Sequence, residues 1–200
     1  MKNVLDDILM NVQWLFESGE IRKKIERIQE EYERNNEPDI DMPFAMGHTF
    51  SSMSFMKFEE AVKRNTKDQY ENFHQYINRL MFEKDVTQVM LSKRSLIKES
   101  TLSRYINGSR DVPEIMVFRM ALALRLNVIE TETLLRKAGR GFREVYKDGV
   151  VMEAIEQGIY DVMKVEAVLR KLTKGVESLF TKKEQEELEF SDEDLEIEII

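Results

Sequence analysis

The chain has 200 residues, of which 42% are hydrophobic and 34% are charged, and its net charge is −8. This composition is typical of a globular protein that buries a core, and it excludes an intrinsically disordered chain. Because the sequence contains no cysteine, it also excludes disulfide bonds, thiolate metal sites and catalysis by a cysteine nucleophile.

The first residues predict two amphipathic helices. Apolar residues recur every three or four positions in a first stripe made of Leu5, Ile8, Val12 and Leu15, which predicts a helix over residues 3–17. Beyond Ser18-Gly19 a second stripe follows at Ile21, Ile25, Ile28 and Tyr32. The second helix has a heptad-like edge, so it packs either on its own domain or on another subunit.

The next segment reads as a connection. Residues 35–54 hold two of the three prolines, together with glycine, asparagine and serines, which predicts a linker or a folded-over loop. Short and longer amphipathic helices are then expected over residues 55–64 and 69–84. The longer one carries its apolar face on Phe73, Tyr76, Ile77, Leu80 and Met81.

The central third predicts a dense series of short helices. Thr87 is a good N-cap for a helix that points Leu91 inward, and Leu96-Ile97 makes a tight connection to the next helix. That helix spans residues 99–106 and stops at Asn107-Gly108. Its inward residues are Leu102 and Ile106.

An apolar helix that Pro113 opens follows as the central core element. Further helices are expected over residues 129–138, 146–157 and 160–172, and strong alternation is confined to LEIEII at the end. The predicted fold class is therefore all-α.

The stretch VTQVMLSKRSLIKESTLSRYINGSRDVPEIMVFRMALALRLN resembles the lambda-repressor-like (Xre/Cro) helix-turn-helix family. The resemblance lies in Thr87-Gln88, Leu91-Ser92, Ile97, the run Thr101-Leu102-Ser103-Arg104, the Asn107-Gly108 stop and the Ala-Leu-Ala-Leu helix. Three positions depart from the family pattern. Leu96 and Arg125 stand where glycine is frequent, and Val112 stands where the family usually has proline. A left-handed turn at Leu96 would therefore be strained.

The resemblance implies that the first motif helix lies across the DNA backbone and the second enters the major groove. Glu99, Ser100 and Arg104 are then the expected base contacts, with Arg104 suited to a guanine and Glu99 to a cytosine. The other free positions of this helix are Lys98, Thr101 and Ser103. We expect phosphate contacts from Lys93, Arg94, Asn107 and Arg110. Gln88 would donate to a phosphate or brace the recognition helix.

The charge distribution supports this reading. Residues 70–140 hold 12 Lys/Arg against 8 Asp/Glu, whereas residues 1–69 hold 10 against 14 and residues 141–200 hold 8 against 16. The only basic third thus contains the predicted recognition helix. Because phosphate neutralisation governs affinity for DNA, the distribution matters more than the acidic total.

The acidic C-terminal run has three possible interpretations. EQEELEFSDEDLEIE holds nine acids and no base between Glu184 and Glu198. Such a run is a solvated tail, or its interspersed apolar residues let it dock on the basic third and compete with DNA, or bind a partner protein. Under competition, deleting residues 184–200 tightens DNA binding at low salt.

The sequence gives little support to a catalytic or a metal-binding site. His48 lies near Ser51 and Ser52, but nothing resembles a nucleophile elbow, and His74 belongs to an amphipathic helix. Two histidines without cysteine or metal-ligand spacing make a poor zinc site. We expect no enzyme activity, no catalytic residue, no metal and no cofactor.

The sequence therefore predicts a DNA-binding transcriptional regulator, most simply a repressor, acting as a homodimer on duplex DNA. The alternative is a protein-interaction module, antitoxin-like or a phage-encoded adaptor, that binds a protein partner through the N-terminal helices or the acidic tail. The start, MKNVLDDILMNVQW, lacks a signal-peptide pattern, and no apolar run reaches about 18 residues, so a cytoplasmic location without a membrane partner is expected. The expected parts are an N-terminal extension and linker, a helix-turn-helix domain, additional helices packed on it and an acidic tail, over residues 1–65, 66–140, 141–180 and 181–200.

Overall fold

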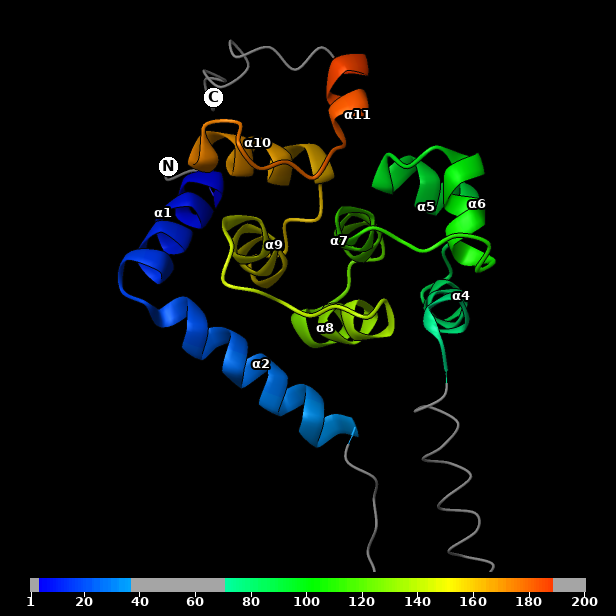
Figure 1. The fold of residues 1–200 in the computed structure, drawn as a ribbon, viewed down its shortest axis with the longest axis horizontal. Helices are drawn as coiled ribbons and strands as arrows, with labels where there is room; N and C mark the ends of the chain where they lie inside the picture. The colour runs from blue at the N-terminus through cyan, green and yellow to red at the C-terminus, as the bar shows by residue number, and fades with distance from the viewer. Residues whose placement is uncertain (1–3, 37–70, 189–200) are drawn as a thin grey trace, which may run out of the picture.

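A computed structural model describes residues 4–36 and 71–188, and all regular structure within them is α-helical. The predicted all-α class is confirmed. Figure 1 shows an elongated arrangement with the N-terminal helix α1 at one end and helices α4, α5 and α6 at the other. The sequence predicts a linker over residues 35–54, but residues 35 and 36 belong to a helix that ends at Asn36. The rest of that segment, the short helix over 55–64 and the LEIEII alternation lie outside the described residues.

The N-terminal helices α1 (Val4–Glu17) and α2 (Glu20–Asn36) form where the two apolar stripes predict them. Both pack on their own chain: α1 against α9 (Tyr146–Glu156) and α10 (Val162–Thr173), and α2 against α8 (Val128–Lys137). The stripe of α2 is buried at Ile21, Ile25 and Ile28. The structure thus favours packing within one domain over a subunit contact for this stripe.

A glycine permits the close approach of α1 and α9. A Cβ atom on Gly149 would lie 3.0 Å from Cε2 of Phe16 and 3.5 Å from Cγ1 of Val12. The ring of Phe16 also lies 4.2 Å, centroid to centroid, from the ring of Tyr146 at the start of α9. Lys24 of α2 pairs with Glu153 of α9, which ties the second helix to the same element.

Helix α7 (Glu114–Ala123) is the centre of the core, as its apolar sequence predicts. It contacts α5, α8 and α10, and all its residues except Ile115 are buried. Phe118 is fully buried and stacks on Phe142, with 6.0 Å between the ring centroids. This helix lies between α8 and α10 and the short helix α5 (Gln88–Ser95), on which α6 (Glu99–Ile106) packs.

Two helices begin later than the apolar periodicity predicts, because a capping residue fixes the first residue of each. Helix α4 is Phe73–Glu83 rather than 69–84, because the Asn72 side chain accepts a hydrogen bond from the Gln75 amide at 3.1 Å. Likewise α10 begins at Val162 because Asp161 accepts from the Lys164 amide at 3.0 Å. The observed bounds of α8 differ from the prediction by one residue at each end, and those of α9 by one residue at the C-terminal end.

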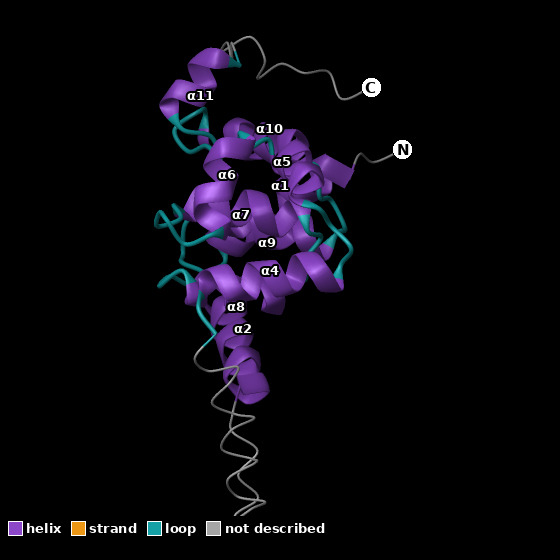
Figure 2. Cartoon of the chain, turned by 90° about the vertical axis from the view of Figure 1, so that its right-hand side faces the viewer, coloured by secondary structure: helices purple, strands orange, loops and turns teal. Residues whose placement is uncertain are grey.

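A further helix, α11 (Lys182–Glu187), lies in the segment that the sequence treats as an acidic tail. Thr181 and Glu184 form its capping box, with the Thr181 amide donating to Oε2 of Glu184 at 2.9 Å. Figure 2 shows α11 standing beyond the other helices, on the side where α5 and α6 lie. Part of the segment expected to be an acidic tail is therefore helical.

Candidate nucleic-acid interface

Helices α5 and α6 are joined by a turn that a non-glycine residue forms. Thr87 caps α5 by accepting from the Met90 amide at 3.2 Å, and Leu91 is fully buried, as predicted. The chain then turns at Leu96, whose φ is +58°, in the left-handed region. Leu96 thus adopts the left-handed conformation that is strained for a residue other than glycine. Arg125, which also stands where the family often has glycine, has a φ of +53°.

Three residues hold α6 from beneath. Leu102 and Ile106 are buried as predicted, with 0% and 7% of their surface exposed, and Tyr105, which the sequence reasoning missed, is a third anchor at 2%. The Arg110 guanidinium lies 6.0 Å from the Tyr105 ring centroid. The Asn78 side chain of α4 donates to the Ile106 carbonyl at 3.1 Å, so α4 also holds the end of α6.

The opposite face of α6 is open. Lys98, Glu99, Ser100 and Arg104 are exposed, while Thr101 and Ser103 are partly buried. No described part of the chain seals Ser100 or Arg104 from solvent. The side chains that the family resemblance assigns to base contacts therefore share one accessible face.

The expected phosphate contacts lie on both sides of this face. Lys93 and Arg94 are exposed on α5, beside a hollow of about 490 Å³ between α5 and the start of α10, and Gln88 is half-buried. Asn107 and Arg110 are exposed at the end of α6. Asn107 has a local role as well, because its side-chain oxygen accepts from the Ser109 amide at 2.9 Å.

A buried arginine braces the turn, and sequence reasoning missed it. Arg119 of α7 is fully buried, and its Nε donates to the Ser95 carbonyl at 2.8 Å while Nη2 donates to the Leu96 carbonyl at 2.5 Å. Burial lowers the pKa of Arg119, and the Glu184 charge opposes that shift. A signal was present: Arg119 is the only charged residue between Ile115 and Leu124.

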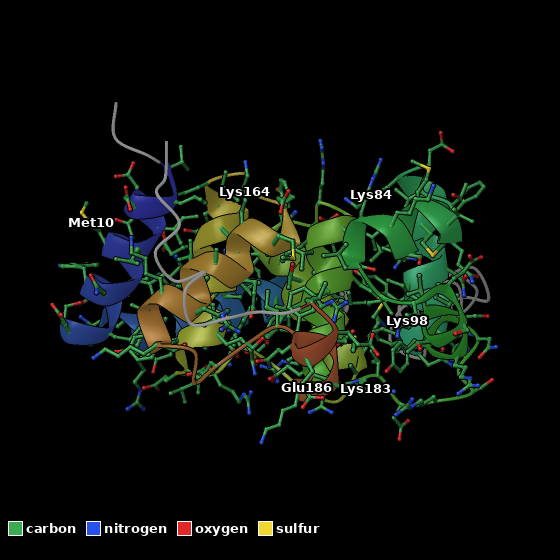
Figure 3. The ribbon with its side chains drawn as sticks, turned by 90° about the horizontal axis from the view of Figure 1, so that it is seen from above. Met10, Lys84, Lys98, Lys164, Lys183 and Glu186 are labelled. Carbon is green, nitrogen blue, oxygen red and sulfur yellow. The ribbon has the colours of Figure 1, made fainter. Side chains whose placement is uncertain are left out.

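Helix α11 reaches the start of α6. Lys98 Nζ lies 2.7 Å from Oε2 of Glu187, and in Figure 3 the labelled Lys98 lies close to α11, which carries Lys183 and Glu186. The hydrogen bond and charge of Glu187 raise the pKa of Lys98. One exposed residue of the candidate interface is thus paired with an acidic side chain of the same molecule.

Within residues 4–36 and 71–188, no group of three or more histidine and acidic side chains is placed to hold a metal ion. None of the helices in these ranges combines the length and the apolar character needed to cross a membrane.

The comparisons with known proteins agree with this geometry. Residues 77–130 match the family described as Helix-turn-helix. No curated protein and no solved structure matches the chain. The matched range begins within α4 and ends at the start of α8, so it contains the anchored α6, the turn at Leu96 and the central α7. Residues 77–130 therefore form a helix-turn-helix domain of the Xre/lambda-repressor-like family, a family of DNA-binding proteins.

Proposed function

We propose that the protein is a sequence-specific DNA-binding transcriptional regulator, most simply a repressor, that inserts α6 into the major groove. The observation that carries this proposal is the exposed polar face of α6, with Ser100 and Arg104 open to solvent while Leu102 is fully buried beneath them. An arginine at such a position can hold a guanine with two hydrogen bonds, which contributes about 1–3 kcal/mol of discrimination.

Basic residues around α6 also support the proposal, because they can contact DNA phosphates whatever the base sequence. Lys93 and Arg94 precede the turn, Arg110 follows α6, and all three are exposed. Contacts of this kind to phosphates release counterions, so affinity would fall steeply as salt rises. The surplus of Lys and Arg in residues 70–140 agrees with this role.

The functional unit we propose is a homodimer on an inverted repeat, since symmetric half-sites suit a two-fold protein. The exposed apolar residues of α1 support a contact there: Trp14 is 58% exposed and Met10, one turn earlier, is 47% exposed. Sedimentation of the wild type and of Trp14→Glu tests this contact. The variant is expected to sediment as a monomer, and an unchanged dimer would place the contact elsewhere.

A selection from random duplex DNA, followed by polarisation titrations over a range of salt, tests the function itself. Arg104→Ala is expected to relax sequence preference at one position, whereas Lys93→Ala is expected to weaken all duplexes alike and to lower the salt slope by about one. A purified wild-type chain that ignores every duplex at low salt would refute DNA binding.

A second candidate, a protein-interaction module, rests on exposed apolar residues around the start of the motif. Phe82 of α4 is 88% exposed, and Val89 and Met90 of α5 are 46% and 36% exposed. A helix-turn-helix fold does not by itself establish function, so such a surface could serve a protein partner. Partner binding that is lost in Phe82→Ser but retained in Arg104→Ala would favour this candidate.

A further inference from the structure

The end of α5 has carbonyl groups that the helix itself does not satisfy. An α-helix leaves its last four carbonyls without an intrahelical donor, and a glycine in the left-handed region usually helps to close the end. Here Leu96 adopts that conformation, and the Arg119 guanidinium supplies donors to the Ser95 and Leu96 carbonyls. A cation at a helix C-terminus is also favourable to the helix dipole. The turn before α6 is therefore closed by a side chain from α7.

The Arg119 side chain is held in turn by residues 178–187, which we call the C-terminal arm. Nη1 of Arg119 donates to Oε1 of Glu184 at 2.9 Å, and the guanidinium lies 4.4 Å from the centroid of the Phe180 ring. Phe180 and Leu179 are 3% and 0% exposed. The arm thus covers the outer side of the guanidinium that contacts the turn.

A buried acid fixes the arm to α10. Glu166 is 1% exposed and accepts hydrogen bonds from the Ser178 hydroxyl at 2.5 Å and from the Leu179 amide at 2.7 Å. Burial raises the pKa of Glu166, and these hydrogen bonds oppose that shift. A continuous set of contacts therefore runs from α10 through the arm and Arg119 to the turn between α5 and α6.

We propose that Arg119 is a positioning residue for DNA recognition and that the C-terminal arm, through Glu184, sets the geometry of the turn before α6. The inference rests on the proposed function, since it concerns how α6 is presented to DNA. Its physical basis is that a guanidinium with three hydrogen-bonded acceptors has one orientation, whereas an arginine lacking its carboxylate partner does not.

The state of Glu184 agrees with this role. Burial alone would raise the pKa of Glu184, but the Thr181 amide and the Arg119 charge outweigh burial, so its pKa lies below the usual value. The carboxylate is therefore charged at neutral pH and faces the guanidinium directly. Hydrogen bonds between charged groups of this kind are about twice as strong as neutral ones.

Two variants of α11 separate positioning from general electrostatics. Glu184→Ala and Glu186→Ala each remove one negative charge from the same short helix, and Glu186 is exposed. Electrostatics alone predicts that both tighten DNA binding, because each reduces repulsion of the phosphates. Positioning predicts the opposite sign for Glu184→Ala, with about a tenfold loss of affinity for the selected duplex, the size expected for one charged hydrogen bond. Affinity for an unrelated duplex should not fall.

Two further variants control for the stability of α11. Thr181→Ala removes the Thr181 hydroxyl, which accepts from the Glu184 amide at 3.3 Å and donates to Oε2 of Glu184 at 2.8 Å. The variant keeps the Thr181 amide and Oε1 of Glu184, the atom that accepts from Arg119. Glu184→Gln keeps an oxygen that can accept from Arg119, so it is expected to restore most of the affinity that Glu184→Ala loses. Arg119 itself is left unchanged in the test, because its replacement would deprive the carbonyl of the buried Ser95 of its donor.

The experiment measures both duplexes by polarisation and, without DNA, amide hydrogen exchange over residues 96–102 in the full chain. Faster exchange there in Glu184→Ala than in Thr181→Ala, together with lost discrimination and rescue by Glu184→Gln, would support the inference. Equal behaviour of Glu184→Ala and Glu186→Ala on both duplexes, or unchanged exchange, would overturn it. A wild type that binds no duplex refutes the proposed function instead, while the exchange data still decide whether the arm holds the turn.

Discussion

Lys98 and Glu187 lie 89 residues apart in the sequence, yet their side chains meet at 2.7 Å beside the first turn of α6. Both side chains are largely open to solvent, with 68% and 43% of their surface exposed. An exposed pair of this kind is weak and sensitive to salt. It nevertheless places a negative charge beside the start of α6, where a DNA phosphate would approach. In the proposed function, the C-terminal arm would therefore both hold the turn and repel DNA.

Glu187→Gln is therefore expected to tighten binding to any duplex at low salt by about twofold and to have no effect at high salt, because screening removes the contribution of an exposed charge. Titrations by fluorescence polarisation at several salt concentrations measure the change. Glu30→Gln is the matched control, since Glu30 is an exposed carboxylate of α2, a helix that packs on α1 and α8. Equal effects of the two variants would contradict a local role for Glu187.

A truncation after Leu188 tests the acidic tail separately from the arm. The removed residues hold six acids and no base, while Glu184 and its contact to Arg119 remain. We expect severalfold tighter binding at low salt with unchanged thermal stability, because the tail raises the repulsion of phosphates. The longer deletion of residues 184–200 is expected to do less, since it also removes the carboxylate that holds Arg119. Unchanged affinity after the shorter truncation would end the competition hypothesis.

Local patterns predicted most of the fold, because periodicity and caps act over a few residues. The N-cap at Thr87 and the anchors Leu102 and Ile106 could be inferred from neighbouring residues. The strain of a left-handed turn at Leu96 could be inferred from the family resemblance, because glycine is frequent at this position. The brace at Arg119 could not, because its partner Glu184 lies 65 residues away in a segment whose composition resembles a solvated tail. A single charged residue in an apolar helix indicates that a buried partner exists, but it does not indicate which residue that partner is.

Leu96→Gly is expected to stabilise the fold. The left-handed conformation costs a non-glycine residue about 1–2 kcal/mol, and glycine removes this cost. Because glycine also makes the unfolded chain more flexible, which disfavours folding, the net stabilisation should be about 0.5–1 kcal/mol. Urea unfolding measures the difference. Leu96→Ala is the control, because it removes the same half-exposed side chain without relieving the backbone. Equal stabilities of the two variants would show that the turn carries no strain.

Gly108→Ala is expected to destabilise the end of α6 for two reasons. Gly108 has a φ of +73°, and a Cβ atom there would lie 2.8 Å from Nδ1 of His74. The combined cost should be about 1–3 kcal/mol in thermal unfolding. Adding His74→Ala should recover the steric part only. A double variant no more stable than Gly108→Ala would mean that the contact with His74 does not matter.

A buried acid sets the pH dependence of stability. Asp148 of α9 is fully buried, and burial raises its pKa to about 7. The hydrogen bond that its Oδ2 accepts from the Arg143 amide at 2.8 Å acts in the opposite direction and lowers this pKa. Among the surrounding charges, Glu114 raises this pKa further, while Arg143 and Lys147 lower it. The folded chain therefore retains a proton near pH 6 that an unfolded aspartic acid, with a pKa of about 3.9, has already lost.

Unfolding thus releases this proton between pH about 4 and about 7, so the contribution of Asp148 to the free energy of unfolding falls as pH rises, by about 1.4 kcal/mol per pH unit. Below this range both states hold the proton, and above it both have lost it. Asp148→Asn stays neutral and keeps an acceptor for the Arg143 amide, so its stability should lack this slope. Urea unfolding of both proteins at half-unit steps from pH 5 to 7.5 measures the difference between their free energies of unfolding. Because both proteins contain the buried Glu166, its contribution cancels in this difference. The variant should gain on the wild type as pH rises to about 7, and parallel curves would show that Asp148 ionises normally in the folded chain.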